Sequence, residues 1–105
     1  MQKGPIQAAQ LKSAPLSREA AEEIAIEVLS FIAADSERLE RFMALSGLSV
    51  DHLRSAATEP GFFTAILDHL AADEPMFLAF AANAGRDPAT IAKARQSLAP
   101  PEPTP

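Results

Sequence analysis

The chain has 105 residues and a formal net charge of −5, with 9 lysines and arginines against 14 aspartates and glutamates. The sequence has no Cys, Trp or Tyr and only two His, which excludes disulfides, thiolate metal sites and a cysteine nucleophile. The length predicts one domain, the 48% hydrophobic content predicts a globular fold, and the acidic balance argues against a nucleic-acid binder.

The start of the chain, up to Leu16, is polar and interrupted by prolines, and it lacks the apolar core of a secretory signal. The richest apolar stretch, residues 24–34, is too short to cross a bilayer. A cytoplasmic location is therefore expected. The predicted organisation is a flexible arm over residues 1–16, a helical domain over 17–98 and a proline-rich tail over 99–105.

Apolar residues at helical spacing, together with capping residues, predict an all-α fold of about six short helices. The helices are expected to begin after Ser17, after Asp35 or Ser36, after Ser49, at Pro60, after Asp73 and after Asp87. Gly47 and Gly85 are expected to end the second and fifth helices in the left-handed conformation. No stretch alternates with period two, so no sheet is expected.

The apolar faces of these helices predict the core of the bundle. The predicted core residues are Val28, Leu29, Ile32, Leu39, Phe42, Leu53, Phe63, Ile66, Leu67, Phe77, Phe80 and Ile91.

The two halves of the chain align with each other when Ala33 is placed on Ala71. The sequence Ala-Ala-Asp at 33–35 then meets the identical sequence at 71–73, and Gly47 meets Gly85. Any two amphipathic stretches can be brought into rough register, but an ungapped match of caps and glycines favours an internal repeat. The predicted pseudo-repeated three-helix units are residues 21–57 and 59–95, and their superposition would test the repeat.

Two segments carry a family resemblance. The first contains Phe31-Ile32-Ala33-Ala34-Asp35, Arg38-Leu39, Arg41-Phe42 and Leu45-Ser46-Gly47-Leu48; the second contains Ile66-Leu67-Asp68-His69-Leu70, Asp73-Glu74 and Phe77-Leu78-Ala79-Phe80. With them the chain resembles the bacterial family called domain of unknown function 3572, over about residues 17–98. The resemblance implies a small, all-helical, cytoplasmic bacterial protein, and it brings no functional residue because the family has no assigned activity.

Asp68, His69 and Asp73 are the nearest approach to a metal or acid–base site, and His69 and Asp73 are four residues apart, so both can lie on one side of a helix end. A transition-metal site would need further ligands, and Asp73 is explained as a helix cap and His69 as a packing residue. His52 is expected on the surface. No glycine-rich phosphate loop or serine elbow is present. We therefore expect no catalytic residue, metal or cofactor, and a protein that is not an enzyme.

The expected function is that of a non-enzymatic protein-interaction module, whose partner is another protein or a second copy. Ile26 and Leu78 are apolar residues away from the buried stripes of their helices, and Arg38 and Arg41 occupy successive turns of one helix. These four residues are the predicted partner contacts. The simpler interpretation of the two arginines is pairing with nearby acids, namely Glu37, Glu40 or Asp35.

The alternative is a helix-turn-helix-like nucleic-acid binder that uses the turn at Gly85 and the basic helix after it. Its predicted contacts are Arg86, Lys93 and Arg95. The same spacing arises in any helical hairpin stopped by glycine, and the first helix is rich in glutamate.

Overall fold

A computed structural model describes residues 16–59 and 61–99 of the chain. The described residues form six helices and no strand, which confirms the all-helical prediction: α2 (Arg18–Ala33), α3 (Ser36–Ser46), α4 (Val50–Ala56), α5 (Phe62–Ala71), α6 (Glu74–Ala84) and α7 (Pro88–Leu98). The predicted arm up to residue 15, the tail from residue 100 and the predicted role of Pro60 lie outside the described residues.

Side-chain caps begin five of these helices. A serine or aspartate oxygen accepts a hydrogen bond from a backbone N–H in the first turn, which satisfies a donor that has no partner within the helix. The capping residues are Ser17, Asp35, Ser49, Asp73 and Asp87. The exception is α5, whose first-turn N–H groups receive no side-chain cap from Gly61.

Two glycines end helices in the left-handed conformation, as predicted. Gly47 follows α3 with a φ of 75°, and Gly85 follows α6 with a φ of 66°. Residues with a Cβ adopt this conformation at a cost, so glycine at these two positions fixes where α3 and α6 stop.

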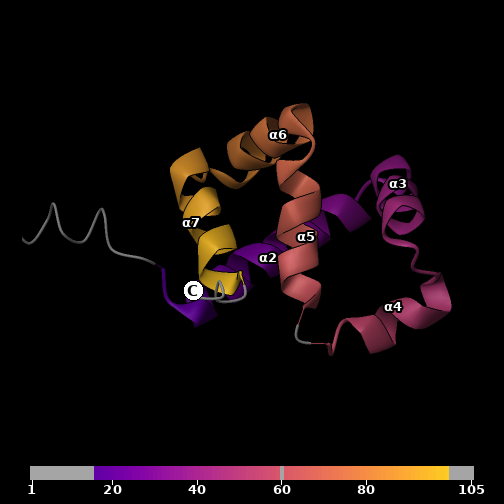
Figure 1. Ribbon diagram of the computed structural model, residues 1–105. Coiled ribbons are helices and arrows are strands. Elements are labelled where there is room, and N and C mark those ends of the chain that lie inside the picture. The colour runs from indigo at the N-terminus through magenta and orange to yellow at the C-terminus, as the bar shows by residue number, and fades with distance from the viewer. Residues whose placement is uncertain (1–15, 60, 100–105) are drawn as a thin grey trace, which may run out of the picture.

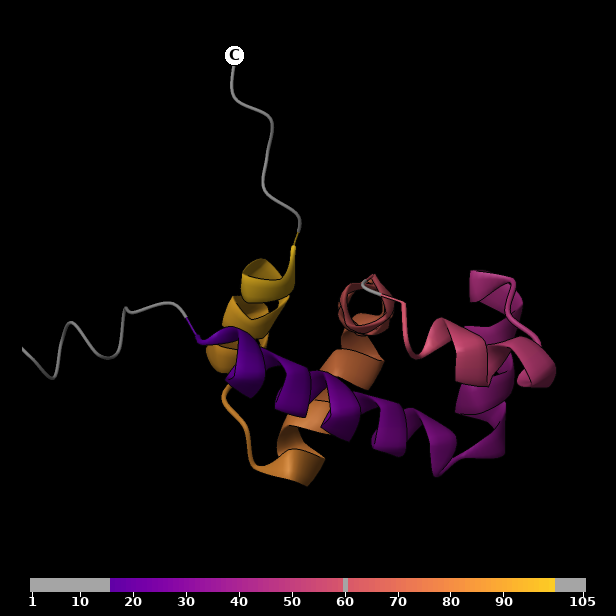
Figure 2. The same ribbon diagram turned by 90° about the horizontal axis from the view of Figure 1, so that it is seen from below.

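The long helix α2 forms the centre of the bundle. Figures 1 and 2 show α7 near its N-terminal end, α5 crossing its middle and α3 at its C-terminal end, and the helices α7, α5 and α3 all pack against it. Five α2 residues are buried, namely Ala21, Ile24, Ala25, Val28 and Ile32. Two of these are alanines, and their small side chains allow a neighbouring helix to approach closely.

Seven of the predicted core residues are buried: Val28, Ile32, Phe42, Ile66, Leu67, Phe80 and Ile91. The prediction was wrong in degree for the other five, Leu29, Leu39, Leu53, Phe63 and Phe77, which are only partly buried and pack against the core from its edge. Helical spacing identifies the apolar face of a helix, but the placement of the neighbouring helices decides how much of that face they cover.

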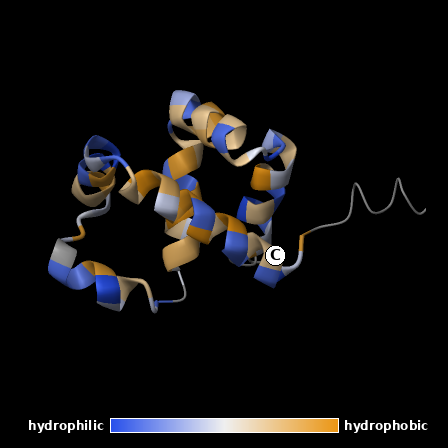
Figure 3. Cartoon of the chain, turned by 180° about the vertical axis from the view of Figure 1, so that it is seen from behind, coloured by the Kyte–Doolittle hydropathy of each residue, from blue (hydrophilic) through white to orange (hydrophobic). Residues whose placement is uncertain are grey.

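The helices α3 and α4 lie at one end of the molecule, away from α7 (Figure 2). Phe42 is the one buried residue in α3, and α4 makes only sparse contacts with the other helices. Much of the hydrophilic colour in Figure 3 falls on these two helices. Apart from Phe42, the apolar residues of this end that pack against the core are only partly buried, namely Leu39, Met43, Leu48, Leu53 and Ala56.

The two halves share contacts as well as caps. Phe31 packs edge-on against Phe80 with ring centroids 5.5 Å apart, and His69 packs edge-on against Phe42 with centroids 5.0 Å apart. The alignment of the two halves places Phe31 on His69 and Phe42 on Phe80. The Phe31–Phe80 contact and the His69–Phe42 contact therefore join equivalent positions of the two halves. The third helices differ, because α7 packs on α2, α5 and α6 whereas α4 is peripheral. The superposition of the two units stays a prediction.

Leu16 is partly buried and packs against the core, although the sequence placed it in the N-terminal arm. It directly precedes the cap Ser17, which is the position where an apolar side chain can fold back onto the first turns of a helix. None of the helices in the described part of the chain has the length and apolar character needed to span a membrane.

Candidate functional site

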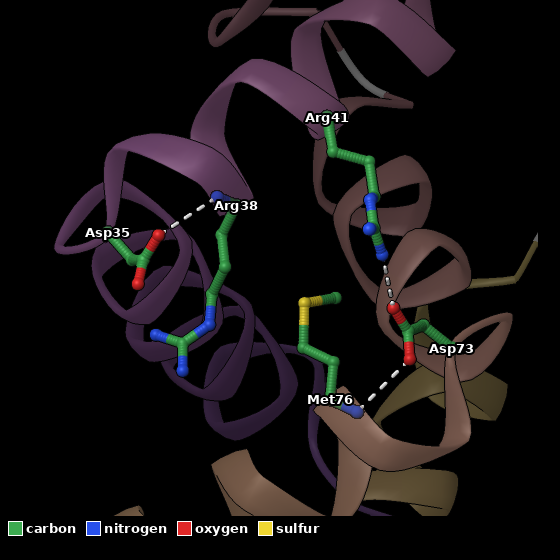
Figure 4. A network of polar contacts seen from close by, with 5 residues as sticks. All are labelled: Asp35, Arg38, Arg41, Asp73 and Met76. Carbon is green, nitrogen blue, oxygen red and sulfur yellow. Dashed lines mark hydrogen bonds and ion pairs between the residues drawn. The ribbon is translucent and has the colours of Figure 1, made fainter.

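The residues considered for metal or acid–base chemistry form hydrogen bonds or packing contacts within the fold. Asp73 accepts a hydrogen bond from the Met76 backbone N–H at 3.1 Å through Oδ1 and from Arg41 Nη1 at 3.2 Å through Oδ2 (Figure 4). His52 is exposed, with its Nδ1 2.8 Å from the Ser49 hydroxyl. The described residues contain no group of three side chains that could hold a metal ion.

His69 is half-buried, and its Nε2 is buried without a hydrogen-bond partner among the described residues. Burial lowers the pKa of His69 below its ordinary value, the nearby negative charge of Asp73 opposes this shift, and the positive charge of Arg41 adds to it. His69 lies opposite Phe42 as a packing partner, which is the role predicted for it.

The basic residues proposed for nucleic-acid contact do not form a free patch. Arg86 donates from Nε and Nη2 to the two carboxylate oxygens of Glu27, both at 2.7 Å, and so points towards α2. These hydrogen bonds lower the pKa of Glu27 and raise that of Arg86. Arg95 pairs with Asp68 at 2.6 Å, and Lys93 is half-buried. Glu27 and Arg86 are 59 residues apart, so periodicity offered no sign of their pairing.

The expected pairing of Arg38 and Arg41 with acids of their own segment is wrong for both guanidinium groups. The Arg38 guanidinium lies over the Phe31 ring, 4.0 Å from its centroid, and Nη1 donates a long hydrogen bond of 3.5 Å to the Phe31 carbonyl. Arg41 reaches across to Asp73. Asp35 acts as a helix cap instead, because its Oδ1 accepts hydrogen bonds from the backbone N–H groups of Glu37 and Arg38.

Ile26 and Leu78 are half exposed, at 50% and 51%, as expected for residues away from the core. They do not lie in one hollow, because Ile26 lines a surface hollow that Leu78 does not reach. Leu45 is more exposed than either, at 72%, and was not predicted as a contact. Helical spacing places it beside the buried Phe42, so the periodicity offered no sign of this exposure.

The hollow at Ile26 has a volume of about 620 Å³ and lies between α2 and α6, with α3 at one end. We call it the α2–α6 hollow and define it by Ile26, Ser30, Phe31, Arg38, Phe80 and Asn83. It joins two of the four predicted partner contacts, Ile26 and Arg38. Phe31 and Asn83 were not predicted as contacts, because residues distant in sequence meet here only through the packing of α2 against α6.

Further hollows adjoin the bundle, and one of them, of about 500 Å³, is lined by Arg41, Leu45 and His69. The groove between α3 and α6 has a volume of about 480 Å³ and contains the carboxylates of Asp35, Glu37 and Asp73. The groove between α5 and α7, of about 440 Å³, has an apolar floor that includes Leu67 and Ile91. The Leu45 hollow has an exposed apolar residue, but its Arg41 is paired with Asp73. Among these hollows, only the α2–α6 hollow contains an exposed large apolar residue together with an arginine that has no carboxylate partner in the described part of the chain.

Comparison with protein families agrees with the resemblance noted in the sequence. The family model described as protein of unknown function (DUF3572) matches residues 18–101, which is most of the chain. The chain belongs to this family. The match begins with α2 and includes all the described helices of this DUF3572 protein. Comparison with curated proteins and with solved structures finds no match.

Proposed function

We propose that this DUF3572 protein is a non-enzymatic interaction module that binds a partner protein through the α2–α6 hollow. One observation carries the proposal. Ile26 and Arg38 were each predicted from the sequence as partner contacts, and they line the same hollow.

The chemistry of the hollow supports a protein ligand. Half-buried Phe31 and buried Phe80 contribute an apolar floor, and Ile26 stands half exposed beside them. Burial of exposed apolar surface contributes about 25 cal/mol for each Å² removed from water, so a partner side chain placed here gains free energy. Polar groups at the rim, including Asn83, can then fix its orientation.

The contacts of Asp73 and His69 support the non-enzymatic part of the proposal. Both carboxylate oxygens of Asp73 are engaged, and His69 packs against an aromatic ring. A general base must be able to reach the proton that it removes, and these two groups meet structural needs instead.

The test is affinity capture from the native lysate with the full chain and two matched variants. Ile26→Asp places a charge inside the hollow, whereas Leu78→Asp makes the same change at a residue of equal exposure outside it. We expect the wild type and Leu78→Asp to capture the same protein and Ile26→Asp to lose it. Capture that survives Ile26→Asp would contradict the proposal.

The same experiment includes the nucleic-acid alternative as an outcome. Nuclease treatment of the lysate before capture should leave the protein partner bound. If the captured material is nucleic acid, or disappears after nuclease treatment, the alternative replaces the proposal. Its predicted contacts Arg86 and Arg95 are both engaged in ion pairs, which makes them poor phosphate ligands as they stand.

A further inference from the structure

Arg38 differs from the other arginines that bound the hollows. Its guanidinium stacks on Phe31 and is half-buried, yet within residues 16–59 and 61–99 it forms no ion pair with a carboxylate. One of its five N–H donors makes a long hydrogen bond to the Phe31 carbonyl. No hydrogen bond of the remaining donors to another described residue is found, and Arg38 lines the α2–α6 hollow.

We infer that the partner segment bound in the α2–α6 hollow is acidic, and that it presents a carboxylate to Arg38 and an apolar side chain to Ile26 and Phe31. This inference rests on the proposed function of the hollow. Arginine forms two parallel hydrogen bonds with a carboxylate, and stacking on an aromatic ring holds its planar group ready for such a ligand. Arg38 is thereby the specificity-determining residue of the surface.

The charge around Arg38 selects this hollow over the neighbouring groove. Arg38 also lines the groove between α3 and α6, where Arg41 pairs with Asp73 but the carboxylates of Asp35 and Glu37 form no ion pair and would repel an acidic segment. Within the α2–α6 hollow the one carboxylate is Glu27, and Arg86 binds both of its oxygens. The net charge of −5 acts at longer range, where salt at physiological strength screens it beyond about 8 Å.

Two more polar side chains complete the fit to a peptide segment. Ser30 and Asn83 line the hollow, and their side chains form no hydrogen bond with other described residues. Figure 4 shows Arg38 directed away from Arg41, which is held by Asp73. The two arginines therefore have different tasks, with Arg41 joining α3 to α6 and Arg38 available to a ligand.

The experiment is an NMR titration of the ¹⁵N-labelled full chain with two capped peptides, acetyl-Leu-Glu-Leu-amide and acetyl-Leu-Gln-Leu-amide, at millimolar concentrations. We expect both peptides to shift resonances of Ile26 and Phe31, with the glutamate peptide binding about tenfold more tightly.

Three variants test the role of Arg38. Arg38→Gln should abolish the preference for the glutamate peptide. Arg38→Lys keeps the charge without the planar fork and should retain only part of it. Arg41→Gln is the control, because Arg41 does not line the hollow, and should leave the preference intact.

The outcomes separate this inference from the proposed function. Equal binding of the two peptides by the wild type, or a preference that persists in Arg38→Gln, overturns the inference. If Ile26→Asp still abolishes the binding of both peptides, the hollow remains a protein-binding surface without acidic specificity. If neither peptide shifts any resonance of the hollow, the inference is overturned and the capture experiment alone decides the proposed function.

Discussion

At the scale of single residues, the packing of His69 in the fold leaves a polar atom buried without a hydrogen bond to another described residue. Its ring packs edge-on against Phe42, while its buried Nε2 has no partner among the described residues. The alignment of the two halves equates His69 with Phe31, which makes the same kind of ring contact without a polar atom. His69 therefore carries a desolvation cost that phenylalanine would not.

We predict that His69→Phe stabilises the protein, by about 1 kcal/mol at neutral pH, because it removes an unsatisfied buried nitrogen. It should also change the pH dependence. Burial holds the pKa of His69 in the folded state below its ordinary value of 6.5. The unfolded chain therefore takes up the proton first, and stability is lost as the pH falls through 6.5 towards the lowered pKa. Urea denaturation across this range measures both effects. Parallel pH profiles for the variant and the wild type would contradict the prediction.

At the scale of helices, local sequence signals determine where each element begins and ends. Oxygen atoms of Ser or Asp cap five helices, and left-handed glycines end α3 and α6. These signals act between near neighbours in the chain, so the sequence predicted them correctly. The sequence could not predict the unequal placement of α4 and α7, because that depends on which helix faces remain free after α2 and α5 have packed.

We predict that Gly47→Ala and Gly85→Ala each destabilise the protein by about 1–2 kcal/mol, because a residue with a Cβ is strained at positive φ. The added methyl group meets no atom within 4 Å at either site, so the loss reports backbone conformation alone. Gly61→Ala is the matched control, since Gly61 has a φ of −90° and equally open surroundings. Thermal unfolding of the three variants gives the comparison. A loss in Gly61→Ala as large as in the other two would refute the backbone explanation.

At the scale of the whole molecule, the core is unevenly distributed. The centre of the bundle is built from α2, α5 and α7, whereas α3 contributes one buried residue, Phe42. The connection of the α3–α4 end to the rest of the molecule therefore depends on this ring, on partly buried apolar residues at the edge of the core, on the stacking of Arg38 on Phe31 and on the ion pair of Arg41 with Asp73.

We predict that Phe42→Ala costs about 3–5 kcal/mol, the usual range for the loss of a buried phenylalanine. Amide hydrogen exchange should accelerate most in α3 and α4, because Phe42 is the buried residue of α3 and the other apolar contacts of this end are only partly buried. Phe63→Ala serves as control and should cost less, since Phe63 is only partly buried. Denaturant unfolding and hydrogen exchange test the two expectations. A cost below about 1 kcal/mol for Phe42→Ala would rule out its anchoring role.

Part of the candidate surface could be predicted from the sequence. The exposure of Ile26 and Leu78 followed from their positions opposite the buried faces of their helices. The stacking of Arg38 on Phe31 joins two different helices, whereas the sequence led us to expect pairing with nearby acids. Asn83 joined the hollow only because α6 lies beside α2.

The sequence by itself determined the helical class, the caps, the two glycine stops and the family, because each depends on neighbouring residues or on a linear pattern. The tertiary structure decided which exposed residues share a surface and which charges are neutralised. Arg86 binds Glu27 across 59 residues, and Arg38 is left without a carboxylate within the described part of the chain. Such pairings depend on the directions in which packed helices point their side chains, and no local pattern encodes them.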